Sequence, residues 1–308
     1  MDGRNSHHRF KNHAIMNTSL DQNVKQDVRK FYDDIGWKEI GEGVYQNARY
    51  EDLRPVSWEY IHKCHLRVGR YLSPTGKYLL DAGSGPIQYP EYLEYSQGYQ
   101  ARVCADISIV ALAEARQRIG DRSTGGQGMF VVADLANLPF RHDTFDGVVT
   151  LHTIHHLPLK EHSQAYQEVH RVLSPSRTAV VVNGWQDSLL MRFFVVPIKW
   201  KNRTRKRIKR TIDNLRSGQP ASGHTIPKTR VKGTYVIKHD ADWLKSEIGS
   251  IMQLDIFVWR SVSVRFLRGY IFPHLGGKWL LSKLYNLEER FPHFLGEHGQ
   301  YPLIVIRK

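Results

Sequence analysis

Residues 77–87 read KYLLDAGSGPI, a short apolar run that ends in a glycine-rich turn. The apolar run predicts a buried strand. Glycines after it let the backbone approach a ligand closely because they carry no Cβ. This turn alone fits either a tight connection to a helix or a cofactor site, so the flanking sequence has to decide between the two.

Strands and helices alternate after this turn. We expect strands at 101–107, 129–135, 145–152 and 178–185, and helices at 159–173 and at 108–120, the latter with Ser108 as its N-cap. Such alternation predicts parallel βαβ units in a sheet that helices cover on both faces. In sheets of this kind, ligands bind beyond the carboxyl ends of the strands.

The end of the chain predicts two more strands, at 254–261 and 301–308. A helix is expected between them at 278–291. Its large apolar residues fall on one face, namely Leu280, Leu284, Leu287 and Phe291.

Acidic residues follow the second and third strands. Asp106 lies 21 residues after Gly85, where a carboxylate can accept hydrogen bonds from ribose hydroxyls. Asp134 could accept a hydrogen bond from an adenine amino group while Leu135 packs against the ring. The plain alternative for Asp106 is a solvated loop acid or a helix N-cap.

The motif order DAGSG, ADIS, ADLANLPF, TFDGVVTLHTIHHL and EVHRVLSPSRTAVVV resembles a class I S-adenosylmethionine-dependent methyltransferase of the type-11 small-molecule group. The resemblance covers roughly residues 77–185. It implies a Rossmann-like, doubly wound α/β sheet of seven strands with an antiparallel last strand, and S-adenosyl-L-methionine as the cofactor. One departure is Ile87, where the family often has a third glycine.

The resemblance also implies which residues bind the cofactor, and it implies no metal. In chain order these are Asp81, Gly83 and Gly85 on the methionine and ribose side, Asp106 on the ribose hydroxyls, Ile107 against the adenine, Asp134 and Leu135 on the base, and Leu151 behind the methionine moiety.

A hydroxyl or acidic carbon acceptor would need a general base for methyl transfer. His155 and His156 follow the fourth strand and are the nearest candidates, although histidines here can also cap a loop or pack in the core. His152, Tyr32 and His239 are weaker candidates. Tyr32 also belongs to an N-terminal helical region that either covers the cofactor as a lid or only packs on the core.

The formal net charge of the 308 residues is +14, and +11 of it lies in residues 199–232. Ile208, Ile212 and Leu215 there have the spacing of a basic amphipathic helix, and Trp200 precedes them. We expect this segment to contact the acceptor, an anionic membrane surface or another polyanion. A solvated charged loop is the plain alternative. Nucleic acid is less favoured because no Asn-Pro-Pro-Tyr-type motif follows the fourth strand.

The chain divides into five expected regions. These are a flexible N-terminus (1–22), a helical lid (23–72), a cofactor-binding core (73–187), a basic and aromatic insertion (188–253) and a closing segment (254–308). Two cysteines are too few for a disulfide framework, and no signal peptide or membrane-spanning run is recognisable. A cytoplasmic location is expected, with peripheral membrane contact through the basic segment as a further expectation.

The leading hypothesis is therefore a methyltransferase that acts on a small-molecule acceptor, such as a lipid-like, isoprenoid or glycan-intermediate compound. Two alternatives stay open at this point. One is an RNA or protein methyltransferase guided by the basic segment. The other is a binding protein that keeps the fold without catalysis.

Overall fold

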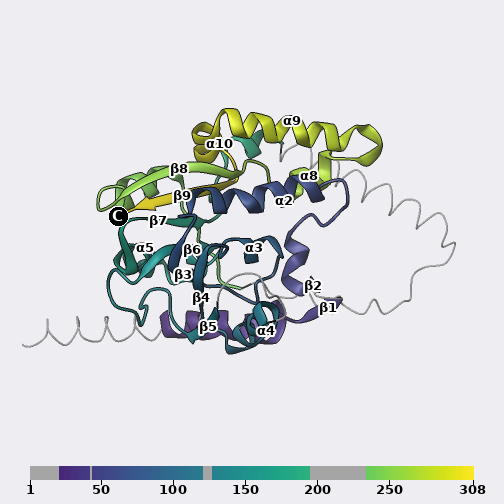
Figure 1. Ribbon diagram of the computed structural model, residues 1–308. Coiled ribbons are helices and arrows are strands. Elements are labelled where there is room, and N and C mark those ends of the chain that lie inside the picture. The colour runs from purple at the N-terminus through teal and green to yellow at the C-terminus, as the bar shows by residue number, and fades with distance from the viewer. Residues whose placement is uncertain (1–20, 42–43, 121–126, 195–233) are drawn as a thin grey trace, which may run out of the picture.

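The computed structural model describes residues 21–41, 44–120, 127–194 and 234–308 (Figure 1). Its centre is a seven-stranded sheet with the strand order β5-β4-β3-β6-β7-β9-β8. The strands are β3 (Gly76–Ala82), β4 (Tyr99–Asp106), β5 (Gln127–Val132), β6 (Phe145–Leu151), β7 (Leu173–Val182), β8 (Gln253–Arg260) and β9 (Tyr301–Arg307).

The direction of the strands matches the expected fold. β3 to β7 pair in parallel, whereas β9 runs antiparallel to both β7 and β8. The prediction of a doubly wound α/β sheet with an antiparallel last strand is confirmed. β7 begins five residues earlier than the predicted strand at 178–185, and β5 ends three residues before the predicted 135.

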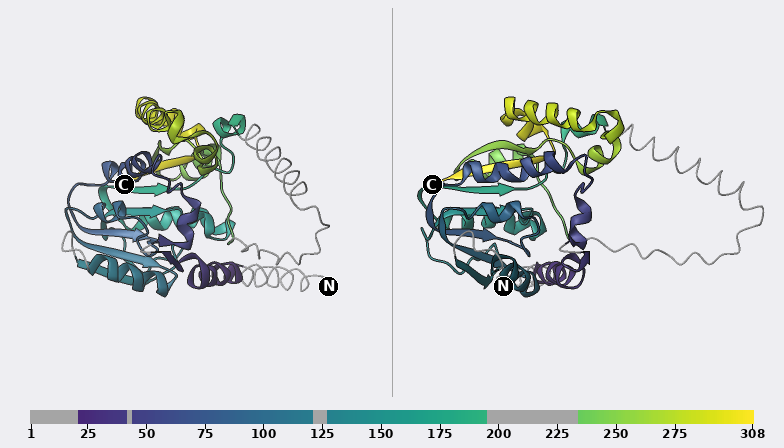
Figure 2. Two further views of the ribbon diagram at one scale, coloured as in Figure 1. Left: turned by 90° about the vertical axis from the view of Figure 1, so that its right-hand side faces the viewer. Right: turned by 45° about the vertical axis from the view of Figure 1, so that its right-hand side comes forward.

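Helices cover both faces of the sheet (Figure 2). The labelled α-helices are α2 (Trp58–Leu66), α3 (Glu91–Glu94), α4 (Ile109–Gly120), α5 (His162–Val172), α7 (Ala241–Trp243), α8 (Val264–Tyr270), α9 (Gly277–Arg290) and α10 (Pro292–His298). Residues 21–31, here called the N-terminal helix, and residues 189–194 are also helical. Short 3₁₀ or π turns are η1 (Tyr32–Gly36), η2 (Gln46–Tyr50), η3 (Arg67–Tyr71), η4 (Ile154–His156), η5 (Leu159–Glu161), η6 (Leu244–Ile248) and η7 (Pro273–Leu275).

Alternation along the central strands gives each face its own core. Leu80 points to one face and packs in a cluster with Val169 of α5. Leu79 points to the other face and packs with Val68 of η3. Both strand residues are fully buried, as expected for parallel strands that lie between two helical layers.

The region predicted as a helical lid (23–72) contains a short hairpin as well as helices. β1 (Glu39–Gly41) pairs with β2 (Val44–Tyr45) in the sequence EIGEGVY. Glycines are poor helix formers and favour turns, which explains the interruption.

The segment between β8 and β9 is long, as predicted, and carries α8, α9 and α10 at the top of Figure 1. Of the apolar residues expected on one face of the helix at 278–291, Leu284 packs against the core, whereas Leu280, Leu287 and Phe291 are each between 43% and 47% exposed. α9 packs through the other side, where Leu281 and Glu288 are buried.

The part of the predicted basic insertion (188–253) that the structure describes after residue 233 contains short helical elements. α7 and η6 follow residue 233, and Leu244 and Ile248 of η6 belong to the core beside α5. Trp200 and the predicted amphipathic helix lie outside the described residues. No helix in the described ranges is long and apolar enough to cross a membrane.

Candidate active site

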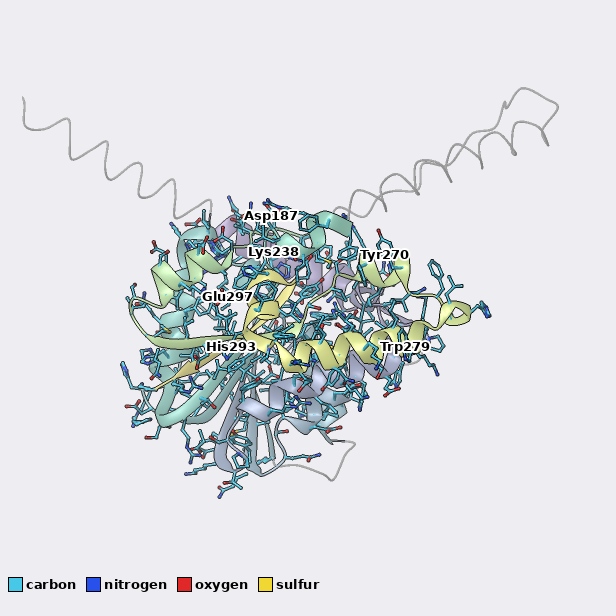
Figure 3. All side chains as sticks on the ribbon, turned by 90° about the horizontal axis from the view of Figure 1, so that it is seen from above. Asp187, Lys238, Tyr270, Trp279, His293 and Glu297 are labelled. Atoms are coloured by element: carbon cyan, nitrogen blue, oxygen red, sulfur yellow. The ribbon has the colours of Figure 1, made fainter. Side chains whose placement is uncertain are left out.

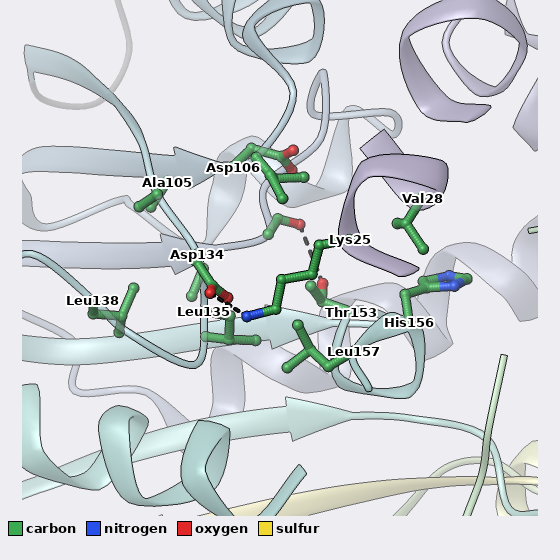
Figure 4. Close-up of a pocket in the computed structure, with 14 residues that line it drawn as sticks. Lys25, Val28, Ala105, Asp106, Asp134, Leu135, Leu138, Thr153, His156 and Leu157 are labelled. Atoms are coloured by element: carbon green, nitrogen blue, oxygen red, sulfur yellow. Dashed lines mark hydrogen bonds and ion pairs between the residues drawn. The ribbon is translucent and has the colours of Figure 1, made fainter. Parts of the chain in front are cut away.

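A pocket lies at the carboxyl ends of the strands, beside the N-terminal helix (Figure 4). Side chains from the ends of β3, β4, β5 and β6 line it. The full lining is Lys25, Val28, Ala82, Gly83, Ala105, Asp106, Ile107, Ala133, Asp134, Leu135, Leu138, Thr153, His156 and Leu157. Parallel α/β sheets bind ligands at this edge.

Five of the predicted cofactor residues meet in this pocket. They are Gly83, Asp106, Ile107, Asp134 and Leu135, and the candidate base His156 joins them. Asp81, Gly85 and Leu151 are not among the lining residues. Their assignment to the methionine side stays a prediction.

Gly83 forms the turn that closes β3. Its φ is +75°, a conformation that residues with a Cβ rarely adopt. A Cβ at this position would lie 2.3 Å from the side chain of Thr153, whose hydroxyl donates a hydrogen bond to the Gly83 carbonyl. Glycine therefore lets the turn and the loop after β6 touch.

Ile87 has a φ of +55°, although it is β-branched. This is the position where the related family often has glycine. The side chain is 1% exposed and packs with Cys104 of β4 and Leu112 of α4. The turn thus keeps its left-handed shape without the glycine, and buried apolar surface offsets the strain.

Asp106 sits at the end of β4 with both carboxylate oxygens in use. They accept hydrogen bonds of 2.9 Å from the backbone N–H groups of Gly85 and Ser108. Burial raises the pKa of Asp106 to about 6, because it outweighs the two N–H donors, and the nearby charges of Asp81 and Asp33 act in the same direction. This carboxyl changes charge within the physiological range.

Ser108 caps α4 as predicted, since its hydroxyl accepts a hydrogen bond of 3.0 Å from the Ala111 N–H. The same hydroxyl donates to Asp33 of η1. This contact connects the segment after the N-terminal helix to the carboxyl end of β4.

Lys25 of the N-terminal helix reaches across the pocket to Asp134 (Figure 4). Its ammonium nitrogen lies 2.5 Å from Asp134 Oδ2 and 2.5 Å from Glu161 Oε2. Burial opposes the charge on Lys25, but the two carboxylates outweigh it, so the pKa of Lys25 lies above its ordinary value. Sequence reasoning missed Lys25, because a lysine in a polar helix carries no pattern that marks it.

Asp81 forms a buried ion pair with Arg102 of the neighbouring strand β4. Arg102 is 2% exposed, and its guanidinium also donates to the Tyr92 carbonyl. Asp81 therefore has a partner inside the fold that the motif alone did not reveal. Burial opposes the charge on Arg102, but the contact with Asp81 outweighs it and raises the pKa of Arg102.

His156 connects the pocket to the segment that follows residue 233. Its Nδ1 lies 2.8 Å from the Tyr235 carbonyl, which can only accept a hydrogen bond, so Nδ1 carries the proton. Nε2 therefore accepts the hydrogen bond from the Tyr32 hydroxyl at 2.8 Å. Burial lowers the pKa of His156 to about 4.

His155 lies beside His156, with ring centroids 4.2 Å apart. Its Nδ1 is 3.2 Å from the side-chain oxygen of Asn183, whose amide nitrogen donates to Tyr166. Nδ1 of His155 is therefore the donor, and Nε2 keeps its lone pair. Burial and the neighbouring His156 hold the pKa of His155 well below its ordinary value, so the ring is a neutral base at neutral pH.

The weaker base candidates lie in different places. Tyr32 is bound to His156 and stacks on Trp37 with centroids 5.0 Å apart. His152 packs against Trp259 at 5.1 Å. His239 lies elsewhere: its Nε2 is 2.7 Å from Nδ1 of His162, and it forms no part of the pair of His155 and His156.

The model of a family described as "Methyltransferase domain" matches residues 80–181. The chain is 27% identical over 151 residues to the eEF1A lysine and N-terminal methyltransferase of Mus musculus, which covers 48% of this chain and 21% of that protein. It is 27% identical over 140 residues to O-methyltransferase resE of Aspergillus sclerotiorum, and this match covers 45% of this chain and 51% of that protein. The chain thus spans about half or less of the length of these relatives.

Two solved structures share the fold over most of this chain. Phosphoethanolamine N-methyltransferase 1 of Haemonchus contortus aligns with a TM-score of 0.55 and 10% identity, over 94% of this chain and 49% of that one. The cyclase SpnF aligns with a TM-score of 0.50 and 16% identity, over 92% of this chain and 96% of that one.

Proposed function

Because residues 80–181 form a methyltransferase domain of the class I, S-adenosylmethionine-dependent family, we propose that this protein methylates a small-molecule acceptor. The observation that carries the proposal is the pocket, which gathers Gly83, Asp106 and Asp134 at the strand ends. A lipid-like, isoprenoid or glycan-intermediate acceptor is the class that we favour. The similarity to O-methyltransferase resE supports transfer of the methyl group to an oxygen atom.

The residues of the pocket fit the cofactor of this family. Asp106 would hold the ribose hydroxyls and Asp134 the adenine amino group, while Ile107, Leu135 and Leu138 offer apolar surface to the ring. S-adenosyl-L-methionine supplies a methyl group that its sulfonium already activates. This chain then has to orient the acceptor, exclude water and accept a proton where the acceptor has one.

His155 and His156 support the proton-transfer role. Nε2 of His155 keeps a lone pair, and Nε2 of His156 already accepts from Tyr32. We assign His155 the role of base, with Tyr32 and His156 as a hydrogen-bonded pair at the mouth of the pocket. In His155→Gln, we expect a large fall in kcat with little change in cofactor affinity.

The N-terminal helix supports the role of a lid. Lys25 and Val28 line the pocket from this helix, and Tyr32 follows directly after it. Lys25 of this helix forms ion pairs with Asp134 and Glu161, and Asp33 of the following η1 accepts a hydrogen bond from Ser108. A segment held by such contacts can open to admit the cofactor at modest cost.

A protein acceptor is the second candidate, and the similarity to the eEF1A lysine and N-terminal methyltransferase favours it. Incubation of the full chain with cell extract and cofactor carrying a radiolabelled methyl group separates the candidates. Label in the lipid or small-molecule fraction supports the proposal, and label in protein or RNA supports an alternative. No label together with no cofactor binding by calorimetry would leave only a binding protein.

We further propose peripheral contact with an anionic membrane, through residues 199–232 and through an exposed surface on η7 and α9. Leu275 of η7 and Trp279 of α9 (labelled in Figure 3) are 78% and 64% exposed, and Lys278 and Lys283 of α9 are exposed as well. An apolar stripe among basic residues suits a lipid interface.

Sedimentation with vesicles tests this contact. Binding to phosphatidylglycerol-containing vesicles, but not to pure phosphatidylcholine, is expected, and Trp279→Ser should weaken it. The matched control is Ile109→Ser, which removes an apolar side chain 58% exposed on α4, away from α9 in Figure 1. Equal loss in both variants, or no binding to either vesicle, would contradict the proposal.

A further inference from the structure

Next to the pocket lies a second group of side chains, here called the basic-aromatic cluster. It comes from the loop after β6, the segment after residue 233, the end of β8 and the start of β9. Its members are His152, His155, Lys238, Trp259 and Tyr301. The rings of His152, Trp259 and Tyr301 are in mutual contact, with centroids 5.1 to 5.8 Å apart.

Lys238 brings a positive charge into this cluster. Its ammonium nitrogen lies 6.0 Å from the centre of the Tyr301 ring and packs against Gly184, where a Cβ would lie 2.7 Å from it. Among the described residues, no carboxylate lies within 4 Å of this nitrogen. Burial alone lowers the pKa of Lys238, which reflects the cost of an ammonium without an anion.

The other strong cation nearby is already neutralised. Arg260 pairs with the buried carboxylate of Glu51 and lies over the Tyr301 ring at 4.7 Å. His152 and His155 of the cluster and the neighbouring His156 are neutral at neutral pH because their pKa values are lowered. Lys238 is therefore the charge that stays uncompensated within the described cluster.

A second observation also indicates a ligand with oxygen acceptors. Trp259 is 1% exposed, and its indole Nε1 has no hydrogen-bond partner among the described residues. Buried donors are normally paired, so this unpaired donor costs free energy that an oxygen-bearing ligand could recover.

The cluster adjoins the cofactor pocket through the two histidines. His156 lines the pocket, and its ring is 4.2 Å from that of His155, which is next to His152 at 6.3 Å. Lys238 is near enough to His152 and His155 to contribute to lowering their pKa values. A ligand held by Lys238 would therefore lie next to His155, the residue that we assign as the base.

We propose that the basic-aromatic cluster binds the methyl acceptor through an anionic oxygen group, a carboxylate or a phosphate, which pairs with Lys238 and accepts a hydrogen bond from Trp259 Nε1. The proposal rests on the proposed methyltransferase function and specifies its substrate class. The acceptor is then an organic anion with an apolar or aromatic part.

The test measures binding of three probes to the full chain loaded with S-adenosylhomocysteine. Benzoate and phenyl phosphate represent the two sources of an anionic oxygen, and benzamide is the neutral match. We expect at least one anion to bind about ten-fold or more tightly than benzamide by calorimetry, and Lys238→Met to remove this preference. Trp259→Phe keeps an aromatic ring but removes the indole N–H, and it should weaken binding of the anion by a smaller factor than Lys238→Met does.

The matched control is Lys245→Met, which removes an exposed lysine paired with Glu297. Lys238→Met is expected to fold, since it replaces a partly buried charge with an apolar chain of similar length. Equal binding of benzamide and the anions, no binding of any probe, or an unchanged preference in Lys238→Met would overturn the proposal. In each case S-adenosylhomocysteine would still bind, whereas its failure to bind folded protein would overturn the proposed function itself.

Discussion

Because we propose that Asp106 binds the ribose of the cofactor, we predict that cofactor binding depends on pH. Its pKa is raised from an ordinary value of 3.8 to about 6, chiefly by burial. Two backbone N–H groups already donate to the carboxylate, and ribose hydroxyls would add further donors. Protonation removes acceptor capacity from one oxygen, so the cofactor should prefer the ionised form.

The size of the effect follows from the population of that form. If only ionised Asp106 binds, the apparent Kd grows with the protonated fraction of the free protein. With a pKa near 6, affinity should be about ten-fold weaker at pH 5 than at pH 7 and nearly constant above pH 7. His156, the histidine that lines the pocket, has a pKa of about 4, so its charge changes little over this pH range.

Calorimetric titration of S-adenosylhomocysteine between pH 5 and pH 8 measures this dependence. Asp106→Asn should bind weakly with a flat pH profile, and Asp187→Asn, which alters an exposed ion pair, should keep the profile of the original protein. Because burial disfavours ionised Asp106, the folded protein gains stability as pH falls through about 6, and Asp106→Asn should not unfold at pH 7. A flat profile in the unaltered protein, or the same slope in Asp106→Asn, would refute the reasoning.

Three further predictions concern residues around the pocket. Ile87→Gly should be more stable than Ile87→Ala by about 1 kcal/mol in urea unfolding, because only glycine relaxes the positive φ; the reverse order would contradict a left-handed residue 87. Arg102→Leu should cost about 3–5 kcal/mol in the same assay since it leaves Asp81 buried without its partner, and adding Asp81→Asn should restore part of the loss. Lys25→Met should tighten S-adenosylhomocysteine binding up to about five-fold, because a partly exposed pair worth about 1 kcal/mol no longer occupies Asp134; weaker binding would mean that Lys25 helps to hold the cofactor.

The sheet could be predicted because its signals are local. Apolar runs of strand length alternate with helical segments, and the seven strands appear near the expected positions. The ends of elements were less predictable. β7 starts at Leu173, since Leu173 pairs with Phe145 of β6 and the strand continues through Pro175, a pairing that the sequence SPSR does not suggest.

Helix α9 shows that the sequence can predict an apolar face without predicting whether that face packs against the protein or points to solvent. Its leucines have helical spacing, but the sequence does not say which side meets the protein. Glu288 decides this in the structure, because its buried carboxylate accepts hydrogen bonds from Tyr60, Arg67 and Ser261. A charged residue in a buried position contradicts the usual pattern, so the spacing of the leucines alone does not show which side of α9 meets the protein.

The motif residues of the pocket were predictable because each follows a strand at a fixed point of the fold. The residues that complete the site come from distant segments and have no motif. Lys25 precedes the sheet by about fifty residues, and Lys238 follows the long basic segment. Only tertiary structure brings Lys25 onto Asp134 and Lys238 next to His155.

The distribution of charge around these residues bears on the reaction itself. The pocket holds the carboxyl groups of Asp106 and Asp134, which suit a cationic methyl donor, whereas the neighbouring cluster holds the ammonium of Lys238. In a methyl transfer to an acceptor hydroxyl, the sulfonium charge of the donor would be lost and the hydroxyl proton would pass to His155, while the anionic group paired with Lys238 would keep its charge. Because electrostatic interactions are stronger where water is excluded, partial exclusion of water would hold that anionic group more firmly against Lys238 during the step. The acidic pocket would thus bind the methyl donor, and the basic-aromatic cluster would bind the acceptor. Both would exclude water from the same methyl transfer.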